Sequence, residues 1–181
     1  SPWIPTTFKL LYGQAFRAPN RYELYYNSGL DPETIRTYEV VYEQSLLAHL
    51  RLLVSGYYYE IDDLIASTED VYGYRNLNEA RAGGVEFELD GRFPGGWTGQ
   101  LGYSLQRAED AQSGDELSNS PRHLLRLNLI APLYRDRLFA GLQLQYLSGV
   151  ETLAGDETDD FAIVNLTLFS QKLLKGLEVS A

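Results

Sequence analysis

The sequence contains no cysteine and no methionine, and only two histidines, His49 and His123. Without cysteine there is no disulfide framework and no thiolate metal site. Two isolated histidines do not predict a metal centre. No apolar run approaches the roughly 18 residues of a membrane-spanning helix. These absences exclude a disulfide scaffold, a zinc domain and a helical membrane protein.

Positive charge is also scarce, with 15 basic against 25 acidic residues and a formal net charge of -10. A nucleic-acid partner is excluded because phosphate binding needs a basic surface. No glycine-rich phosphate loop opens a helix, and no nucleophile, base and acid are placed together. We therefore expect a protein that is not an enzyme and that has no cofactor.

The start and end of the chain suggest a part of a longer protein. There is no initiator methionine and no signal peptide in residues 1–20. The last residues, 177–181, alternate like a strand that is interrupted in its middle. We expect further strands beyond this sequence.

Apolar residues recur at every second position in segment after segment. In residues 137–147, Leu138, Ala140, Leu142, Leu144 and Tyr146 share one face, and the opposite face is largely polar. A strand reverses side-chain direction at each residue, so this period predicts strands with one apolar and one polar face. The apolar face is either the dry core of a sandwich or the lipid face of a barrel. The chain's 14 tyrosines and 16 glycines suit the barrel, with tyrosine at membrane interfaces and glycine at crowded positions in the lumen.

The pattern predicts about nine antiparallel strands, at residues 6–17, 34–47, 50–66, 72–92, 97–108, 122–133, 137–148, 161–172 and 177–181. The connections alternate in length. Short turns are expected near residues 48–49, 93–96, 134–136 and 174–176, and long loops at 18–33, 67–71, 109–121 and 149–160. Outer-membrane barrels have short periplasmic turns and longer outer loops, whereas a soluble meander has no reason to sort its loops by length.

The alternation also assigns each side chain to a face. The outward, lipid-facing set is expected to contain Leu52, Val54, Phe87, Leu101, Leu127, Leu129, Leu142, Leu144, Val164 and Leu166. Tyr58 belongs to the same face. The inward set contains Tyr57, Tyr59, Glu39, Glu43, Glu86, Glu88 and Asp90. Carboxylates are costly in lipid, so a wet or plugged lumen is implied.

Five motifs follow one another along the chain: FRAPNRYELYY at 16–26, DPETIRTYE at 31–39, YYYEIDDLI at 57–65, RNLNEARAGGVEFEL at 75–89 and SNSPRHL at 118–124. In order and spacing they resemble the barrel of TonB-dependent outer-membrane receptors. Val41 stands where that family often has glycine.

The resemblance implies an all-β fold, an antiparallel transmembrane β-barrel segment that supplies about nine strands of a roughly 22-stranded barrel. Residues 1–181 would then form one partial barrel domain, and the plug, the N-terminal half of the barrel and the last strand would lie outside this sequence. The implied function is uptake of a scarce bulky nutrient across a Gram-negative outer membrane, energised through TonB. A ferric siderophore or similar metal chelate is the expected cargo, with cobalamin as another possibility. The implied partners are outer-membrane lipid and lipopolysaccharide, the plug and remaining strands, and the TonB complex.

Two other interpretations stay open at this point. A passive outer-membrane porin would have the same strands around an open lumen without a plug. A soluble β-sandwich interaction module would bury the apolar face in a core, and it would not need tryptophan and tyrosine at its strand ends.

Candidate ligand-binding residues cluster where the first strand enters a long loop, at Arg17, Arg21, Tyr22, Tyr25 and Tyr26. Tyr72, Tyr74 and Arg75 are a second set of the same chemistry. Aromatic faces and guanidinium groups suit anionic or aromatic chelates. The same residues would also fit an aromatic girdle with snorkelling arginines. The five carboxylates of residues 149–160 form an acidic loop whose spacing matches no calcium site, and no metal site is expected.

Overall fold

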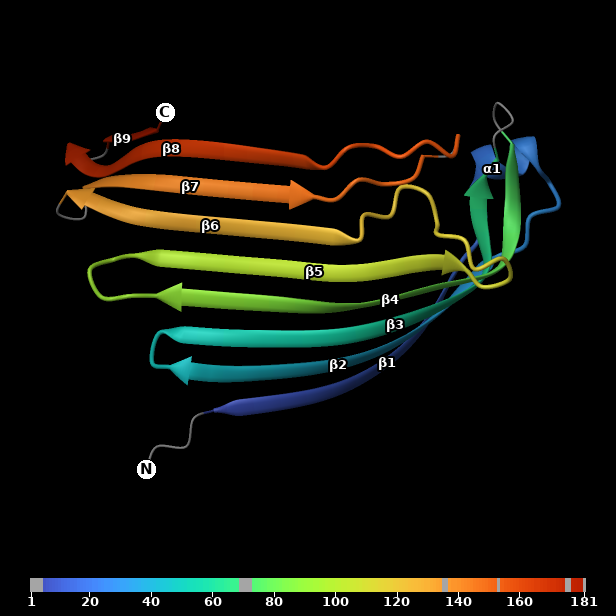
Figure 1. Cartoon of the computed structure of the whole chain (residues 1–181), viewed down its shortest axis with the longest axis horizontal. Coiled ribbons are helices and arrows are strands. Elements are labelled where there is room, and N and C mark those ends of the chain that lie inside the picture. Colours follow the sequence, from blue (N-terminus) through green and yellow to red (C-terminus); the bar gives the residue numbers. More distant parts are fainter. Residues whose placement is uncertain (1–4, 69–72, 135–136, 153, 175–176, 181) are drawn as a thin grey trace.

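The computed structural model describes residues 5–68, 73–134, 137–152, 154–174 and 177–180. Its strands are β1 (Thr6–Arg17), β2 (Glu33–Leu47), β3 (Leu50–Ser67), β4 (Tyr74–Arg92), β5 (Thr98–Asp110), β6 (His123–Tyr134), β7 (Leu138–Leu147), β8 (Phe161–Leu174) and β9 (Leu177–Ser180). One short helix, α1 (Arg21–Tyr26), follows β1. The strands form one curved sheet (Figure 1).

All nine strands pair antiparallel with their sequence neighbours, in the order β1 to β9. The short connections gather at one end of the sheet and the long ones at the other, as the alternation of loop lengths predicts (Figure 1). The sheet is open, because β1 and β9 are its two edges in the described part of the chain. The predicted all-antiparallel, unclosed sheet is therefore confirmed.

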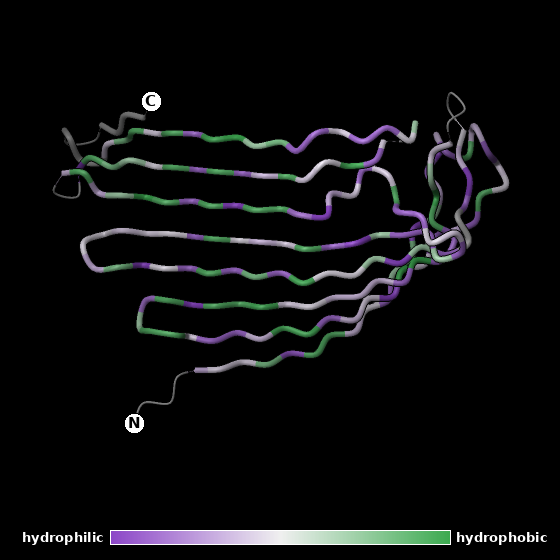
Figure 2. The backbone as a smooth tube through the Cα atoms, in the orientation of Figure 1, coloured by the Kyte–Doolittle hydropathy of each residue, from purple (hydrophilic) through white to green (hydrophobic). Residues whose placement is uncertain are grey.

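The register places apolar and polar residues in neighbouring rows that run across six strands. Paired residues form an apolar row of Leu52, Leu89, Leu101, Leu127, Leu144 and Val164. The row next to it, on the opposite face, consists of Arg51, Asp90, Gln100, Asn128, Gln143 and Asn165. Hydropathy alternates along each strand for the same reason (Figure 2). The predicted separation into an apolar and a polar face is confirmed across β3 to β8.

A hollow on the sheet belongs mainly to the polar face, with Glu86, Glu88, Gln100, Ser104, Arg126 and Asn128 among its lining residues. Glu39 and Glu43 share this face, since they pair with Tyr57 and Leu53. Arg51 neutralises part of the charge here, because its guanidinium contacts Asp90 at 2.5 Å and Glu43 at 3.4 Å. The carboxylates that are expected to face inward therefore share the polar face of the sheet.

Among the described residues, the hydrophobic side chains that are buried are few: Leu30, Val41, Ile65 and Ala80. Many large apolar side chains are instead exposed on the apolar face, including Leu166 at 79% and Leu10 at 73%. A sandwich needs a second sheet to cover such a face, and every strand in the described ranges belongs to the same sheet. The sandwich interpretation is therefore wrong.

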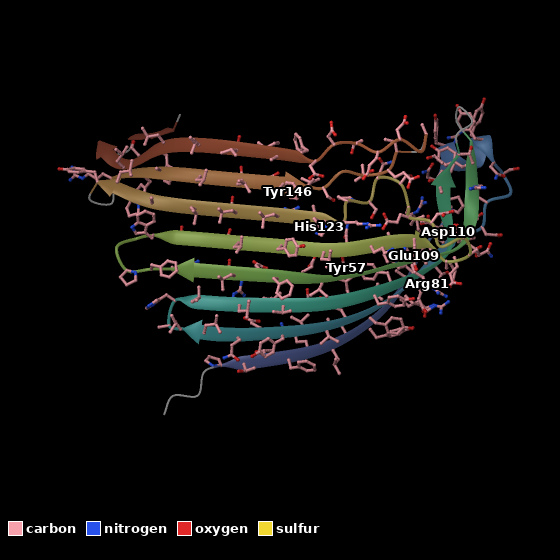
Figure 3. All side chains as sticks on the ribbon, in the orientation of Figure 1. Tyr57, Arg81, Glu109, Asp110, His123 and Tyr146 are labelled. Carbon is pink, nitrogen blue, oxygen red and sulfur yellow. The ribbon has the colours of Figure 1, made fainter. Side chains whose placement is uncertain are left out.

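The boundary of the apolar face toward the long loops is marked by tyrosine. Tyr12, Tyr38 and Tyr58 are paired across β1 to β3, with ring centroids 5.4 and 6.5 Å apart. The next outward row holds charged residues, in which Arg36 contacts Glu60 at 3.4 Å. Further along the sheet, His123 and Tyr146 lie toward the same end (Figure 3), and the hydroxyl of Tyr103 is hydrogen-bonded to Nδ1 of His123 at 2.8 Å. An aromatic row between an apolar band and a charged band is typical of a membrane interface.

Three details differ from the sequence expectations. Residues 21–26 form α1, although the whole stretch 18–32 is predicted as loop. The fourth strand begins at Tyr74 rather than at residue 72. β3 and β4 also continue past the rest of the sheet as a separate hairpin tip, which stands beside α1 (Figure 1). No helix in the described ranges is both long and apolar enough to cross a membrane.

Candidate functional site

The candidate site lies at the long-loop end, where α1 meets the tip of the β3–β4 hairpin. α1 begins at a capping box. The side chain of Asn20 accepts hydrogen bonds from the backbone N–H groups of Tyr22 (2.9 Å) and Glu23 (3.0 Å). The Glu23 carboxylate accepts the backbone N–H of Asn20 at 2.7 Å in return. These bonds satisfy the exposed donors of the first turn and fix where the helix starts.

Arg17, at the end of β1, donates to two carboxylates. Its Nε and Nη2 bind the two oxygens of Glu33 at 2.6 and 2.9 Å, and its Nη1 lies 3.1 Å from both oxygens of Glu23. The fork geometry of guanidinium suits this bidentate contact. Only 10% of the Glu23 side chain and 13% of the Glu33 side chain are exposed, so the cation compensates two largely buried charges.

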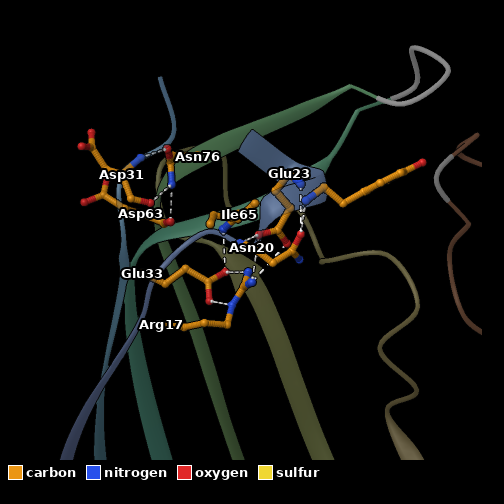
Figure 4. A network of polar contacts seen from close by, with 9 residues as sticks. Arg17, Asn20, Glu23, Asp31, Glu33, Asp63, Ile65 and Asn76 are labelled. Carbon is orange, nitrogen blue, oxygen red and sulfur yellow. Dashed lines mark hydrogen bonds and ion pairs between the residues drawn. The ribbon is translucent and has the colours of Figure 1, made fainter. Parts of the chain in front are cut away.

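The loop between α1 and β2 is tied to the hairpin tip by hydrogen bonds from side chain to backbone (Figure 4). Glu33 accepts the N–H of Ile65 at 2.7 Å. Asn76 accepts the N–H of Asp31 at 2.9 Å and donates to the carbonyl of the same residue at 3.1 Å. Asn27 donates to the carbonyl of Tyr74 at 2.9 Å. The two long loops are thus joined across 47 residues of sequence in this last contact.

These contacts bring four tyrosines together. The rings of Tyr22 and Tyr26 lie 4.9 Å apart, those of Tyr25 and Tyr26 5.0 Å apart, and Tyr74 lies 6.1 Å from Tyr22 and 6.5 Å from Tyr26. We call these residues the tyrosine cluster. Tyr25 is 80% exposed, and the exposed fractions of Tyr22 and Tyr26 are 50% and 40%. A hydrogen bond with Tyr26 raises the pKa of Tyr22, so its phenol stays neutral at physiological pH.

The structure therefore brings most of the predicted ligand-binding residues together at one end of the sheet. Arg17 is the exception, because its side chain is engaged in ion pairs within the protein. Tyr22, Tyr25, Tyr26 and Tyr74 form the cluster, and Arg21 and Arg75 are exposed. Tyr72 lies outside the described residues.

Sequence reasoning missed the residues that hold the cluster in place, which are Glu23, Asn27, Glu33 and Asn76. Only the first had a local signal, because Asn20 and Glu23 have the spacing of a capping box. The others act through contacts between distant segments. No group of three or more histidine, cysteine or acidic side chains in the described ranges lies close enough together to hold a metal ion.

An open antiparallel sheet with an exposed apolar face, a row of tyrosines at the boundary of that face and a polar hollow is typical of a segment of an outer-membrane β-barrel. The family model described as "TonB dependent receptor-like, beta-barrel" matches residues 1–181, so the chain belongs to the TonB-dependent receptor family. The expected family is thereby confirmed. Its described members are receptors and transporters rather than enzymes.

A curated relative is the vitamin B12 transporter BtuB of Vibrio cholerae serotype O1, which is 31% identical over 128 residues. That match covers 67% of this chain and 20% of the relative, so the chain corresponds to about a fifth of the length of the curated relatives it matches.

Solved structures show the same fold. The copper transporter OprC superimposes with a TM-score of 0.81 at 18% identity, over 99% of this chain and 30% of that chain. A mutant of the ferric enterobactin receptor PfeA of Pseudomonas aeruginosa gives a TM-score of 0.79 at 20% identity, over 97% of this chain and 32% of that one. The ferripyoverdine receptor of the outer membrane of the same organism gives 0.70 at 19% identity, over 92% and 25%.

Proposed function

We propose that this chain is part of the barrel of an active-uptake receptor in the outer membrane of a Gram-negative bacterium, energised through TonB. The observation that carries the proposal is the family match over residues 1–181, together with the polar row of Arg51, Asp90, Gln100, Asn128, Gln143 and Asn165. Such a row would be costly against lipid, so in a barrel it faces water or a plug. The plug, the remaining strands and the TonB contact belong to the rest of the protein.

The cargo we propose is a ferric siderophore or a similar metal chelate. Support comes from structural neighbours that are receptors for ferric enterobactin and ferripyoverdine. The tyrosine cluster adds a chemical reason, because aromatic faces and neutral phenols contact aromatic and anionic chelates well. Cobalamin is the second candidate, and it is favoured by the sequence match to a vitamin B12 transporter.

We further propose that the ligand arrives from the side of the long loops and first meets the tyrosine cluster, with Arg21 and Arg75 as exposed cations beside it. Tyr72 is included among the proposed ligand contacts on the basis of the sequence. Arg17 supports these residues indirectly, through its ion pairs with Glu23 and Glu33. The outward apolar face and its tyrosine row would contact membrane lipid, with lipopolysaccharide on the side of the long loops.

A binding panel on the complete receptor tests the proposal. Ferric catecholate, ferric hydroxamate and ferric pyoverdine-type chelates, and cobalamin, are titrated against the purified protein. Replacing Tyr22, Tyr26 and Tyr74 together by alanine removes aromatic contacts of about 1 kcal/mol each, so affinity should fall tenfold or more. The matched control replaces Tyr38 and Tyr58, which lie in the interface row, and should leave affinity unchanged. Equal affinity of both variants and the parent would place recognition elsewhere in the receptor.

A further inference from the structure

The tip of the β3–β4 hairpin has little support from the sheet. The pairing of β2 with β3 ends at Asp62, and the pairing of β4 with β5 begins at Ala80. Between these points, residues 64–67 pair only with residues 74–77 across the hairpin. Asp63 adopts a positive φ of 56° at the point of departure, a conformation uncommon for residues other than glycine. The tip thus leaves the sheet at a bend.

The loop before β2 supplies the contacts that the sheet does not. Glu33 is central, because one of its oxygens accepts both the Ile65 N–H and Nη2 of Arg17, at 2.7 and 2.9 Å. Its other oxygen accepts Nε of Arg17 at 2.6 Å. This carboxylate therefore joins the end of β1 to the top of β3. Leu30 and Ile65, with exposed fractions of 8% and 9%, are buried in this same region.

The tyrosine cluster contains residues from both segments that this contact joins, the loop before β2 and the tip of the β3–β4 hairpin. Tyr22, Tyr25 and Tyr26 belong to the loop, and Tyr74 belongs to the tip. If the tip moves away from α1, the contacts of Tyr74 with Tyr22 and Tyr26 are lost while those within α1 persist. The cluster therefore exists as one surface only when loop and tip are held together.

We propose that Glu33, oriented by Arg17, is a positioning residue that locks the loop of residues 18–33 onto the β3–β4 tip and so assembles the tyrosine cluster before ligand arrives. The inference rests on the proposed function for its purpose, but the lock itself is a property of the protein without ligand. A binding surface that is already assembled avoids the ordering cost of assembling it on binding.

The lock is tested on the complete receptor by the distance between two spin labels, measured by pulsed electron paramagnetic resonance without ligand. Exposed Ser28 in the loop and Ser67 in the tip are replaced by cysteine and labelled; residues 1–181 contain no other cysteine, and any cysteine elsewhere in the receptor is first replaced by serine. We expect a narrow distribution in the parent. Glu33→Ala should broaden it about twofold or add a second, longer distance, since two conformations become populated.

Two substitutions of Glu33 separate its hydrogen bond with the Ile65 N–H from its ion pair with Arg17. Glu33→Gln keeps an acceptor for the Ile65 N–H and removes the charge that Arg17 binds, so its broadening should be smaller than that of Glu33→Ala. Combining Arg17→Gln with Glu33→Gln should broaden the distribution further than Glu33→Gln alone, because Arg17 also pairs with Glu23 and the single change leaves that ion pair in place. Glu60→Gln is the control, since it breaks the ion pair with Arg36 on the same strands outside the cluster. Gel electrophoresis of heated and unheated samples confirms that each variant has assembled, since a folded barrel migrates differently from the heat-unfolded chain.

An unchanged, narrow distribution in assembled Glu33→Ala, or equal broadening in Glu60→Gln, would overturn the proposal. Ligand affinity gives a second measurement that depends on the proposed function. If Glu33→Ala lowers the assembled fraction to about one tenth, the apparent Kd should rise about tenfold. A receptor that binds none of the tested chelates would refute the proposed cargo, and the spin-label result would still decide whether the lock exists.

Discussion

Leu142 and Gln143 are neighbours on β7 and face opposite sides of the sheet, so they provide a sharp test of the lipid and lumen assignment. Leu142 pairs with Leu129 and Leu166 on the apolar face, and Gln143 pairs with Asn128 and Asn165 on the polar face. Both are flanked by described strands on each side. We expect Leu142→Arg to destabilise the folded barrel strongly and Gln143→Arg to do so weakly.

The magnitude follows from the depth of Leu142. It lies four residues from Tyr146, which is at the long-loop boundary, and four from Leu138, where the strand begins. A rise of about 3.3 Å per residue and a tilt near 40° put it about 10 Å from either boundary, near the middle of a band roughly 25 Å tall. Arginine at that depth costs about 2–4 kcal/mol.

Gln143→Arg loses one hydrogen bond, the one that Asn165 donates at 3.1 Å. Such a bond contributes about 1 kcal/mol, and the new side chain remains on the polar face. Urea titration of the complete receptor folded into phospholipid vesicles measures both variants. The difference in free energy of unfolding between them should be at least about 1 kcal/mol, with Leu142→Arg the less stable. Equal losses, or a greater loss for Gln143→Arg, would refute the assignment of faces.

Three further outcomes are expected. Gly84→Ala should lower the free energy of unfolding by about 1–3 kcal/mol, because a Cβ there would come within 2.7 Å of a backbone carbonyl, whereas Gly102→Ala, with no atom within 4 Å, should be nearly neutral in the same urea titration. Asn20→Ala should cost about 1 kcal/mol in the local stability of α1, seen as faster amide exchange in that helix. The N–H of Gly149 and the hydroxyl of Tyr146 lower the pKa of Asp160, so its stabilisation of loop 149–160 is present above the ordinary aspartate pKa and is lost as pH falls through the lowered value. Pepsin cleavage of this loop, relative to Asp160→Asn, should therefore rise only below about pH 4, and a rise already at about pH 5, where pepsin still cleaves and the ordinary aspartate is ionised, would contradict the assignment.

The strands and their faces were predictable because a sheet with one apolar and one polar face requires a period of two in the sequence. Leu127 and Asn128 differ in polarity because they lie on opposite faces of the sheet, and each of the strands β3 to β8 repeats this contrast at its own positions. Glycine and proline mark the turns between strands, as at residues 93–96, and proline is compatible with β6 near its end at Pro132. Antiparallel order follows from the short turns.

The candidate site was predictable only in part, because the loop and the helix that form it carry no such period. The tyrosines were visible in the sequence, but their assembly depends on contacts such as that between Asn27 and Tyr74. α1 was missed because six residues carry too little periodicity, although the capping residues Asn20 and Glu23 mark its start. The ion pairs of Arg17 depend on where α1 and β2 place Glu23 and Glu33, and no sequence period encodes this.

Uptake in cells tests the central claim most directly. A strain that lacks the complete protein is compared with one that expresses it, each with and without TonB, and accumulation of radiolabelled ferric chelates and cobalamin is measured. The account predicts accumulation of one of these ligands only when both the receptor and TonB are present. Accumulation that depends on the receptor and is equal without TonB would show a passive pore and contradict it.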